Sequence, residues 1–176
     1  IGSRLVARER VLGRVTPAVG DLVPEIEGAY ERILVPMKLG LIGEEVLSTA
    51  LRLADYQRCA IVAVHVIRVP LDRALDAPMF DAEEQAEASL AEARLLAEEA
   101  GVEIEAKIVR SRAIGEEIVE EAVVHNVDLI VMGSAPRWRR QSRFFSPTVD
   151  YVLRKAPCEV MVIAYPQGVI EDEALA

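Results

Sequence analysis

The order of apolar and polar segments along the chain predicts an α/β fold, in which helices cover both faces of a five-stranded parallel sheet. Short apolar runs typical of strands alternate with longer amphipathic runs typical of helices from residue 32 to residue 165. One of these runs, Cys59 to Val69, is apolar on both sides, as expected for a central parallel strand. Ligand-binding loops are therefore expected outside the carboxyl ends of the strands, near a switch point.

The first half of this region is predicted to contain two strands and two helices. Arg32 to Met37 is a short apolar run typical of a buried strand, and Glu44 to Tyr56 places five apolar side chains on one helix face. Cys59 to Val69 forms the second strand. The segment from Ala82 to Ala100 carries a narrow stripe of alanine and leucine, and Gly101 after it is typical of a helix end.

The second half repeats the alternation. Val102 to Arg110 alternates between apolar and polar residues, which is typical of a strand exposed on one face. The elements after it are predicted to be a helix at Ile114 to His125, a strand at Asp128 to Met132, a helix at Pro147 to Lys155 and a last strand at Glu159 to Tyr165.

Composition limits the function classes that fit this chain. With 176 residues, of which 52% are hydrophobic, one core is expected. The 20 basic and 29 acidic residues give a net charge of -9, which argues against general nucleic-acid binding. Cys59 and Cys158 lack metal-ligand spacing and are too few for a disulfide framework, so we expect no metal site and a reducing, cytoplasmic setting.

Three parts are predicted along the chain: a basic flank and Pro/Gly linker at residues 1–30, the α/β domain at residues 31–166, and an acidic tail at residues 167–176. Ile1 to Arg14 resembles the basic flank that follows a membrane helix on its cytoplasmic side. The chain is then expected to be a piece of a transporter, tethered to the inner face of the cell membrane. A cloning boundary or a frayed surface helix explains the same residues equally well.

The segment from Asp128 to Ser134 and the Ser146-Pro147-Thr148 that follows its loop are the most informative part of the sequence. A strand that ends in Gly133-Ser134 leaves N–H groups unpaired, and a helix start adds further N–H donors, an arrangement that suits an anion. Ser146 and Pro147 are better explained as an N-cap and a first helical residue without any ligand. The loop between these segments carries four arginines and three aromatic residues: Arg137, Trp138, Arg139, Arg140, Arg143, Phe144 and Phe145.

Four segments of the chain resemble motifs of the universal stress protein domains. They are Ile33-Leu-Val-Pro36, Val64-His65-Val66, Asp128-Leu-Ile-Val-Met-Gly133-Ser134 and Val152-Leu-Arg-Lys-Ala-Pro-Cys158-Glu-Val160. The resemblance spans about residues 31 to 166 and implies a Rossmann-like sheet of order 3-2-1-4-5 and a homodimer formed through the last strand. The loop from Pro136 to Pro147 is similar to versions of this domain that are fused behind bacterial amino-acid permeases.

Nucleotide-binding members of that family carry Gly-x-x-Gly, nine residues, then Gly-Ser or Gly-Thr. Here Gly133 matches, but Pro136 replaces the second glycine and Ser146-Pro147 replace the last pair, while Lys38 stands where an acidic residue is typical. Proline supplies no N–H, so binding of ATP in the usual way is in doubt. The resemblance implies that ATP, another adenine nucleotide or another anion would contact these positions: Pro36, Met37, Lys38, Val66, Met132, Gly133, Ser134, Pro136, Arg137, Ser146, Pro147 and Thr148.

A basic edge is predicted where the strands end, because Lys38, Arg68, Arg110 and Arg112 fall there together with the loop arginines. Three interpretations remain open: side-chain cations that replace the missing N–H donors for an anionic ligand, docking on anionic lipid or on a membrane domain, and a solvated, salt-bridged loop.

Other polar residues are expected to be structural. His65 and His125 lack a neighbour at the spacing of a catalytic or metal site. The helical group Glu116, Glu117, Glu120 and Glu121 is expected to form a hydrated face.

We therefore expect a cytoplasmic regulatory or ligand-sensing domain, not an enzyme, with a degenerate nucleotide site, in an amino-acid permease. The alternatives are a freestanding ATP-binding universal stress protein and a structural dimerisation module without a ligand.

Overall fold

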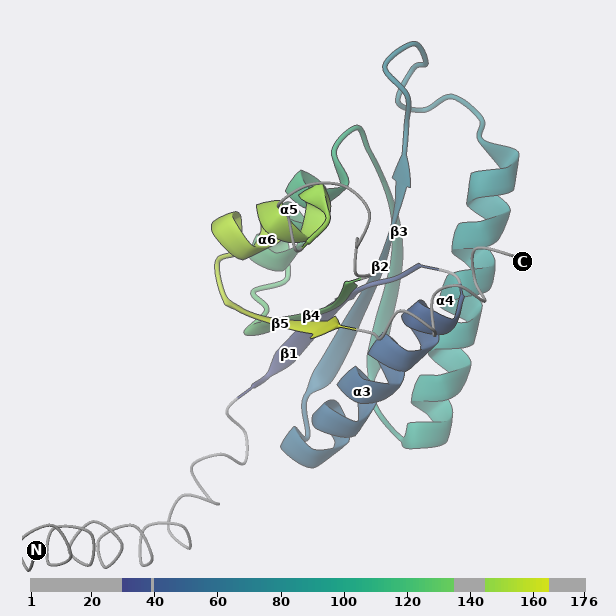
Figure 1. Cartoon of the computed structure of the whole chain (residues 1–176). Helices are drawn as coiled ribbons and strands as arrows, with labels where there is room; N and C mark the ends of the chain where they lie inside the picture. The colour runs from purple at the N-terminus through teal and green to yellow at the C-terminus, as the bar shows by residue number, and fades with distance from the viewer. Residues whose placement is uncertain (1–29, 39, 135–144, 165–176) are drawn as a thin grey trace, which may run out of the picture.

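The computed structural model describes residues 30–38, 40–134 and 145–164, which form a five-stranded parallel sheet with helices on both faces (Figure 1). The strand order is β3-β2-β1-β4-β5, which confirms the predicted order. The elements are β1 (Arg32–Pro36), α3 (Leu41–Gln57), β2 (Ala60–Arg68), α4 (Phe80–Ala100), β3 (Ile104–Ser111), α5 (Ile114–Val124), β4 (Leu129–Ser134), α6 (Pro147–Lys155) and β5 (Glu159–Ala164). The expected linker, the acidic tail and Tyr165 lie outside the described residues.

Two apolar layers hold the helices on the sheet. Helices α3 and α4 cover one face and α5 and α6 cover the other (Figure 1). Strand β1 is buried on both sides, because Ile33 and Val35 pack in the first layer and Leu34 packs in the second. This two-sided burial explains why the strand reads as a continuous apolar run. Within the described residues, no helix combines the length and apolarity needed to cross a membrane.

The structure corrects one boundary that matters for function. The sequence indicated a strand ending at Met132, with free N–H groups at Gly133 and Ser134, and this was wrong. Both residues continue β4, where they pair with Ile163 and Ala164 of β5. Ser134 is 3% exposed. The neighbouring strand therefore uses part of the hydrogen-bonding capacity that had been assigned to an anion.

Strands β1 and β4 part early, and this opens the carboxyl edge of the sheet. Their pairing covers only Ile33 with Leu129 and Leu34 with Ile130. On its other side, β1 stays paired with β2 as far as Pro36, and the Met37 N–H donates to the Val64 carbonyl at 2.8 Å. The strand order changes direction between β1 and β4, so the opening lies at the switch point, where ligands bind in open α/β sheets.

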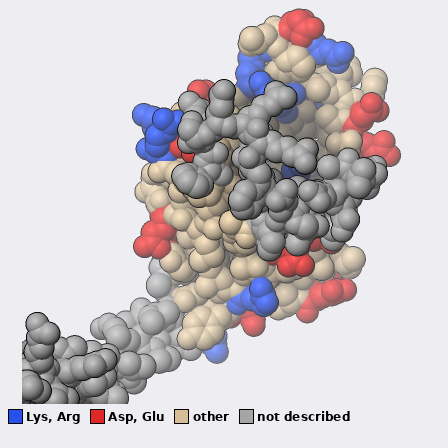
Figure 2. Space-filling model, in the orientation of Figure 1, with Lys and Arg blue, Asp and Glu red and all other residues tan. Residues whose placement is uncertain are grey.

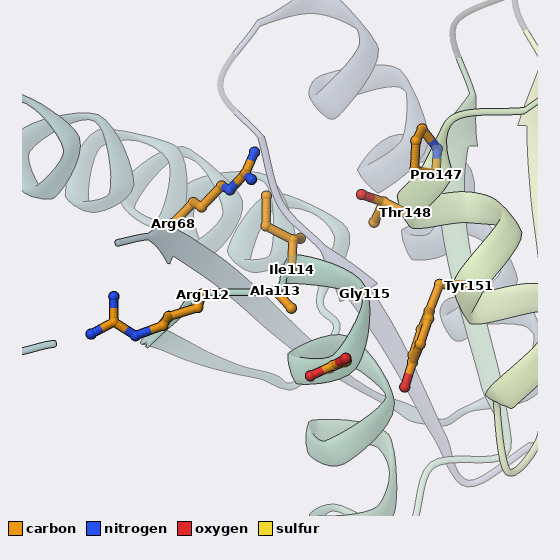
Figure 3. A pocket seen from close by; sticks show the side chains of 9 residues that line it. Arg68, Arg112, Ala113, Ile114, Gly115, Pro147, Thr148 and Tyr151 are labelled. Carbon is orange, nitrogen blue, oxygen red and sulfur yellow. The ribbon is translucent and has the colours of Figure 1, made fainter. Parts of the chain in front are cut away.

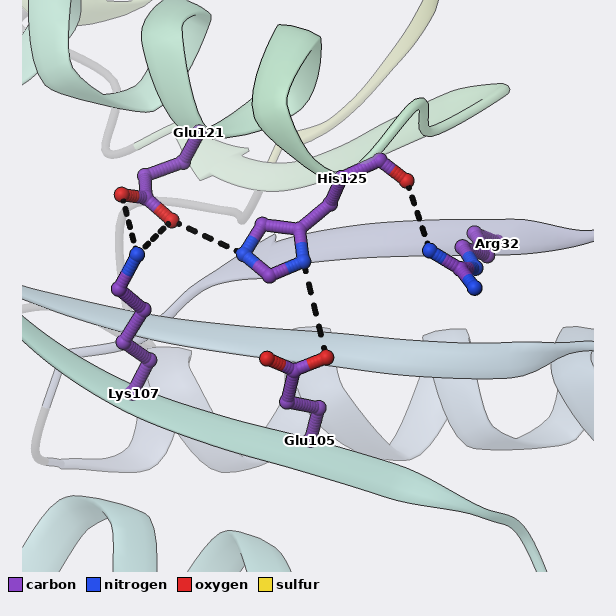
Figure 4. A network of polar contacts seen from close by, with 5 residues as sticks. All are labelled: Arg32, Glu105, Lys107, Glu121 and His125. Carbon is purple, nitrogen blue, oxygen red and sulfur yellow. Dashed lines mark hydrogen bonds and ion pairs between the residues drawn. The ribbon is translucent and has the colours of Figure 1, made fainter.

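A buried polar network lies at the opposite edge of the sheet (Figure 4). The Glu121 carboxylate accepts two hydrogen bonds from Lys107 Nζ, at 2.8 and 2.9 Å, and lies 3.1 Å from His125 Nε2. Glu121 is 5% exposed, so its expected place on a hydrated face was wrong. His125 Nδ1 also lies 3.6 Å from Glu105, and the His125 carbonyl accepts from Arg32 at 3.1 Å. The His125 ring therefore lies between two carboxylates, so the expectation that it has no carboxylate neighbour was wrong, and its structural role stays a prediction.

Candidate functional site

A cleft of ≈ 350 Å³ opens where β1 and β4 part. Its volume falls within the range of about 300–1,000 Å³ typical of ligand pockets. Apolar side chains dominate the lining. Its polar residues include Lys38, which follows the end of β1, and Thr148, in the first turn of α6. The lining residues are Pro36, Met37, Lys38, Ile42, Gly43, Val46, His65, Val66, Ile114, Ile118, Met132, Gly133, Ser146, Thr148 and Val149.

The structure brings most of the predicted site residues together around this cleft. Those that line it are Pro36, Met37, Lys38, Val66, Met132, Gly133, Ser146 and Thr148. Pro147 lines a neighbouring pocket, and Ser134 lines neither pocket. Pro136, Arg137 and the other loop arginines lie outside the described residues. That any of these residues binds a ligand stays a prediction.

Several lining residues were not singled out from the sequence. Ile42 and Val46 come from the first turns of α3, and Ile114 and Ile118 come from α5. Their spacing of four residues is typical of any core-facing helix, so the sequence carries no signal that distinguishes a cleft wall from a core.

Gly43 has a specific reason to be glycine. A Cβ atom placed there would overlap the carbonyl oxygen of Lys38 and lie 3.0 Å from its carbonyl carbon. The first turn of α3 therefore rests directly on the backbone that follows β1. This close approach fixes one wall of the cleft against another, and only a residue without a side chain permits it.

Ser146 caps α6, as expected. Its Oγ accepts a hydrogen bond from the Val149 N–H at 3.2 Å, and Pro147 occupies the first helical position. The hydroxyl is therefore engaged by the helix itself. Thr148 lies one position further and contributes an N–H and a hydroxyl for which no partner is found among the described residues.

His65 contributes a polar ring to the apolar cleft. Its Nδ1 is buried and has no hydrogen-bond partner among the described residues. Burial lowers the pKa of His65, so the neutral imidazole is favoured. A neutral ring offers one donor and one acceptor, which distinguishes it from the methyl and methylene groups around it.

The predicted basic edge is only partly available for anions. Arg110 donates to the carbonyls of Leu75 and Ala77 and forms an ion pair with Glu83. Arg112 donates to the carbonyls of Pro70 and Arg73, at 2.7 and 3.0 Å.

These two guanidinium groups hold the segment between β2 and α4, which for them favours the third of the open interpretations, a salt-bridged loop. The side chains of Lys38 and Arg68 have no hydrogen-bond or ion-pair partner among the described residues. In Figure 2, basic and acidic side chains are interspersed around the upper part of the face shown.

Comparisons with known proteins agree with this architecture. The Universal stress protein family profile matches residues 29–164. A universal stress protein of Methanocaldococcus jannaschii is 24% identical over 155 residues, which cover 85% of this chain and 91% of that protein.

Two similar solved structures hold nucleotides. A universal stress protein in complex with cAMP has a TM-score of 0.62 and 19% identity, over 77% of this chain and 97% of that one. The universal stress protein of Archaeoglobus fulgidus in complex with dAMP has a TM-score of 0.60 and 20% identity, over 76% of this chain and 96% of that one. The family match covers most of the chain, including every described strand. The chain belongs to the universal stress protein family.

Proposed function

We propose that the cleft binds an adenine nucleotide and that the domain is a cytoplasmic regulatory module rather than an enzyme. The observation that carries this proposal is that two parts of the cleft adjoin at the switch point of the sheet. One is an apolar slot lined by Val66, Met132, Ile114 and Ile118, and the other is a cationic rim formed by Lys38 and the start of α6 at Thr148. Two structural relatives hold cAMP and dAMP, which supports the choice of an adenine nucleotide.

The apolar part of the cleft suits a flat base. Val66 and Met132 come from neighbouring regions of the sheet edge, and Ile114 and Ile118 come from the helix that covers it. A purine that enters this slot loses contact with water over most of its surface, and the buried Nδ1 atom of His65 adds a polar group at the wall.

The rim suits phosphate. Lys38 is exposed at the end of β1, and the positive end of α6 brings Thr148 to the cleft. Because Gly133 is engaged in the sheet and Ser146 caps α6, side-chain cations rather than a glycine-rich backbone would neutralise the phosphate charge. We therefore expect weaker nucleotide binding than a full glycine motif would give.

Calorimetric titration with adenosine, AMP and ATP tests the proposal. We expect saturable heat with all three and tighter binding of the two phosphorylated ligands. Val66→Trp should abolish binding because the indole fills the slot, whereas Val124→Trp, at a position 59% exposed on the far end of α5, should bind normally.

Lys38→Gln separates the rim from the slot. The substitution should lower the affinity for AMP several-fold, as expected for the loss of one charge-assisted contact, and leave the affinity for adenosine unchanged. Absence of heat at millimolar concentrations of all three ligands would remove the nucleotide from the proposal.

The partner half of the proposal is that the domain forms a homodimer through β5 and acts on a membrane permease. Strand β5 is an edge of the sheet and exposes Met161 at 38%, so its backbone and side chains are open to a second copy. The permease assignment is supported only by the basic flank and the arginine loop of the sequence. Met161→Lys should give monomers in sedimentation, while charge reversal of Arg137, Arg139 and Arg140 should abolish binding to anionic vesicles and leave the dimer intact.

A further inference from the structure

A second pocket of ≈ 260 Å³ lies beside the cleft and shares Ile114 and Thr148 with it (Figure 3). It is formed where the end of β2 meets the first turns of α5 and α6. Its lining residues are Arg68, Arg112, Ala113, Ile114, Gly115, Glu116, Pro147, Thr148 and Tyr151.

Among the described residues that line this pocket, Arg68 is the cation whose side chain has no partner. Its side chain reaches toward Ile114, whereas the Arg112 side chain points away from the other lining residues (Figure 3). The Arg112 guanidinium donates to two backbone carbonyls, but the Arg68 guanidinium has no hydrogen bond or ion pair within the part of the chain that the structure describes. A guanidinium group presents five N–H donors in a planar fork that matches phosphate and carboxylate geometry.

Backbone N–H groups face the same pocket. Helix α5 begins at Ala113 without a side-chain cap, and its first intrahelical bond is donated by Glu117 to the Ala113 carbonyl. The N–H groups of Ile114, Gly115 and Glu116 therefore have no partner among the described residues. Thr148 adds its N–H and hydroxyl from the first turn of α6.

The two helix starts are held together by a close contact. A Cβ atom at Gly115 would lie 3.1 Å from Cβ and Cδ1 of Tyr151, so the backbone of α5 packs directly on that ring. The ring forms one wall of the pocket. The positive ends of both helices therefore open on the same pocket as Arg68, and their fields add to its charge.

We propose that this pocket binds an oxyanion, either a phosphate or a carboxylate group, with Arg68 and Thr148 as its side-chain ligands. This goes beyond the nucleotide cleft and does not require that the cleft be occupied. The shared walls allow the oxyanion to come from the molecule in the cleft or from a separate anion. Glu116 is the one acidic residue in the described lining, and it is exposed, so water screens its charge.

Amide chemical shifts in the intact chain test this proposal, with inorganic pyrophosphate and with citrate as separate probes. Saturable shifts are expected at Ile114, Gly115, Glu116 and Thr148. Arg68→Gln should lower the affinity for at least one of the two probes by about tenfold, since a bidentate charge-assisted contact is lost. The matched control is Arg73→Gln, which removes the same charge from a residue outside the lining and keeps the backbone carbonyl that accepts from Arg112.

Two further variants sharpen the result. Thr148→Val should weaken binding by several-fold, and Glu116→Gln should tighten it slightly because a like charge is removed. Shifts that stay linear with concentration, as an adventitious ion only would give, overturn the proposal. Equal effects of Arg68→Gln and Arg73→Gln overturn it as well, because they would indicate a general field rather than a site.

The same chemical-shift titrations distinguish the source of the oxyanion and test the nucleotide proposal independently. If AMP or ATP shifts the cleft and the pocket together, with an affinity that Arg68→Gln lowers, the oxyanion belongs to the ligand in the cleft. If pyrophosphate shifts the pocket while adenosine and AMP shift nothing, the pocket proposal holds and the nucleotide proposal fails.

Discussion

Removing the ammonium group of Lys107 should show how strongly the buried Glu121 carboxylate depends on its partners. Lys107→Met keeps most of the aliphatic stem and deletes the two hydrogen bonds of 2.8 and 2.9 Å. The Glu121 side chain is 6% exposed, so water cannot replace these bonds, and His125 at 3.1 Å remains as its neighbour.

The expected loss is about 1.5–3 kcal/mol in the free energy of unfolding, the range for hydrogen bonds to charged groups whose partner is left buried. It should fall below the value of about 3–5 kcal/mol for a fully buried ion pair, because the Lys107 side chain is 40% exposed and keeps part of its hydration. Against a total stability of about 5–15 kcal/mol, this loss is easy to measure by urea unfolding.

A double-mutant cycle isolates the pair. Lys107→Met combined with Glu121→Leu should return to within about 1 kcal/mol of the wild type, because no buried charge is then left unpaired. Lys155→Met, the same change on an exposed helix end, should cost no more than about 0.5 kcal/mol. The reasoning is refuted if Lys107→Met also stays within 0.5 kcal/mol, roughly the limit for surface changes, or if the two substitutions are additive.

Three further changes test individual groups. Burial lowers the pKa of His65 below its ordinary value of 6.5, so the unfolded chain binds a proton more readily than the folded chain. The free energy of unfolding should therefore fall as the pH drops below 6.5. Urea unfolding at pH 7.5 and 5.5 should show a smaller difference in this free energy for His65→Gln than for the wild type. Gly43→Ala should cost about 1–3 kcal/mol through its overlap with Lys38, whereas an unconstrained helix position would gain stability from the same change. The hydrogen bond of 2.6 Å from the Tyr30 hydroxyl to Glu159, together with burial, raises the pKa of Tyr30. The stability that this hydrogen bond contributes is therefore present below pH 10 and is lost as the pH rises through the pKa of the folded chain. The temperature of unfolding should depend less on pH between pH 8 and 11 for Tyr30→Phe than for the wild type.

Much of the architecture follows from local pattern. Strands β1 and β4 are apolar because both faces of the sheet are covered there, and the amphipathic spacing of α3 and α4 matches the one apolar layer that these two helices share. Boundaries were less predictable, since β4 continues through Gly133 and Ser134 only because β5 is there to pair with them.

The place of the cleft was predicted from the sequence, but the partners of the charged residues near it were not. The ends of β1, β2 and β4 meet as a parallel sheet requires, and the cleft there is lined by Lys38, Val66 and Met132, three positions that the family resemblance implied. The engagement of Arg110 and Arg112 could not be predicted, because it depends on where the segment between β2 and α4 places its carbonyl groups. A residue's position along a strand fixes the edge that it reaches, but its partners depend on contacts that are distant in sequence.

Helix α5 belongs to both edges of the sheet at once. Its first turn lines the cleft and the second pocket, and its last turns carry the carboxylate held by Lys107. It spans 11 residues, or about 16 Å at 1.5 Å per residue. A hydrogen-bonded cylinder of this length does not compress, so a tilt imposed on its ligand-facing end must be matched by displacement at the other. We therefore expect any tilt of the first turn of α5 to displace Glu121 at the opposite edge of the sheet.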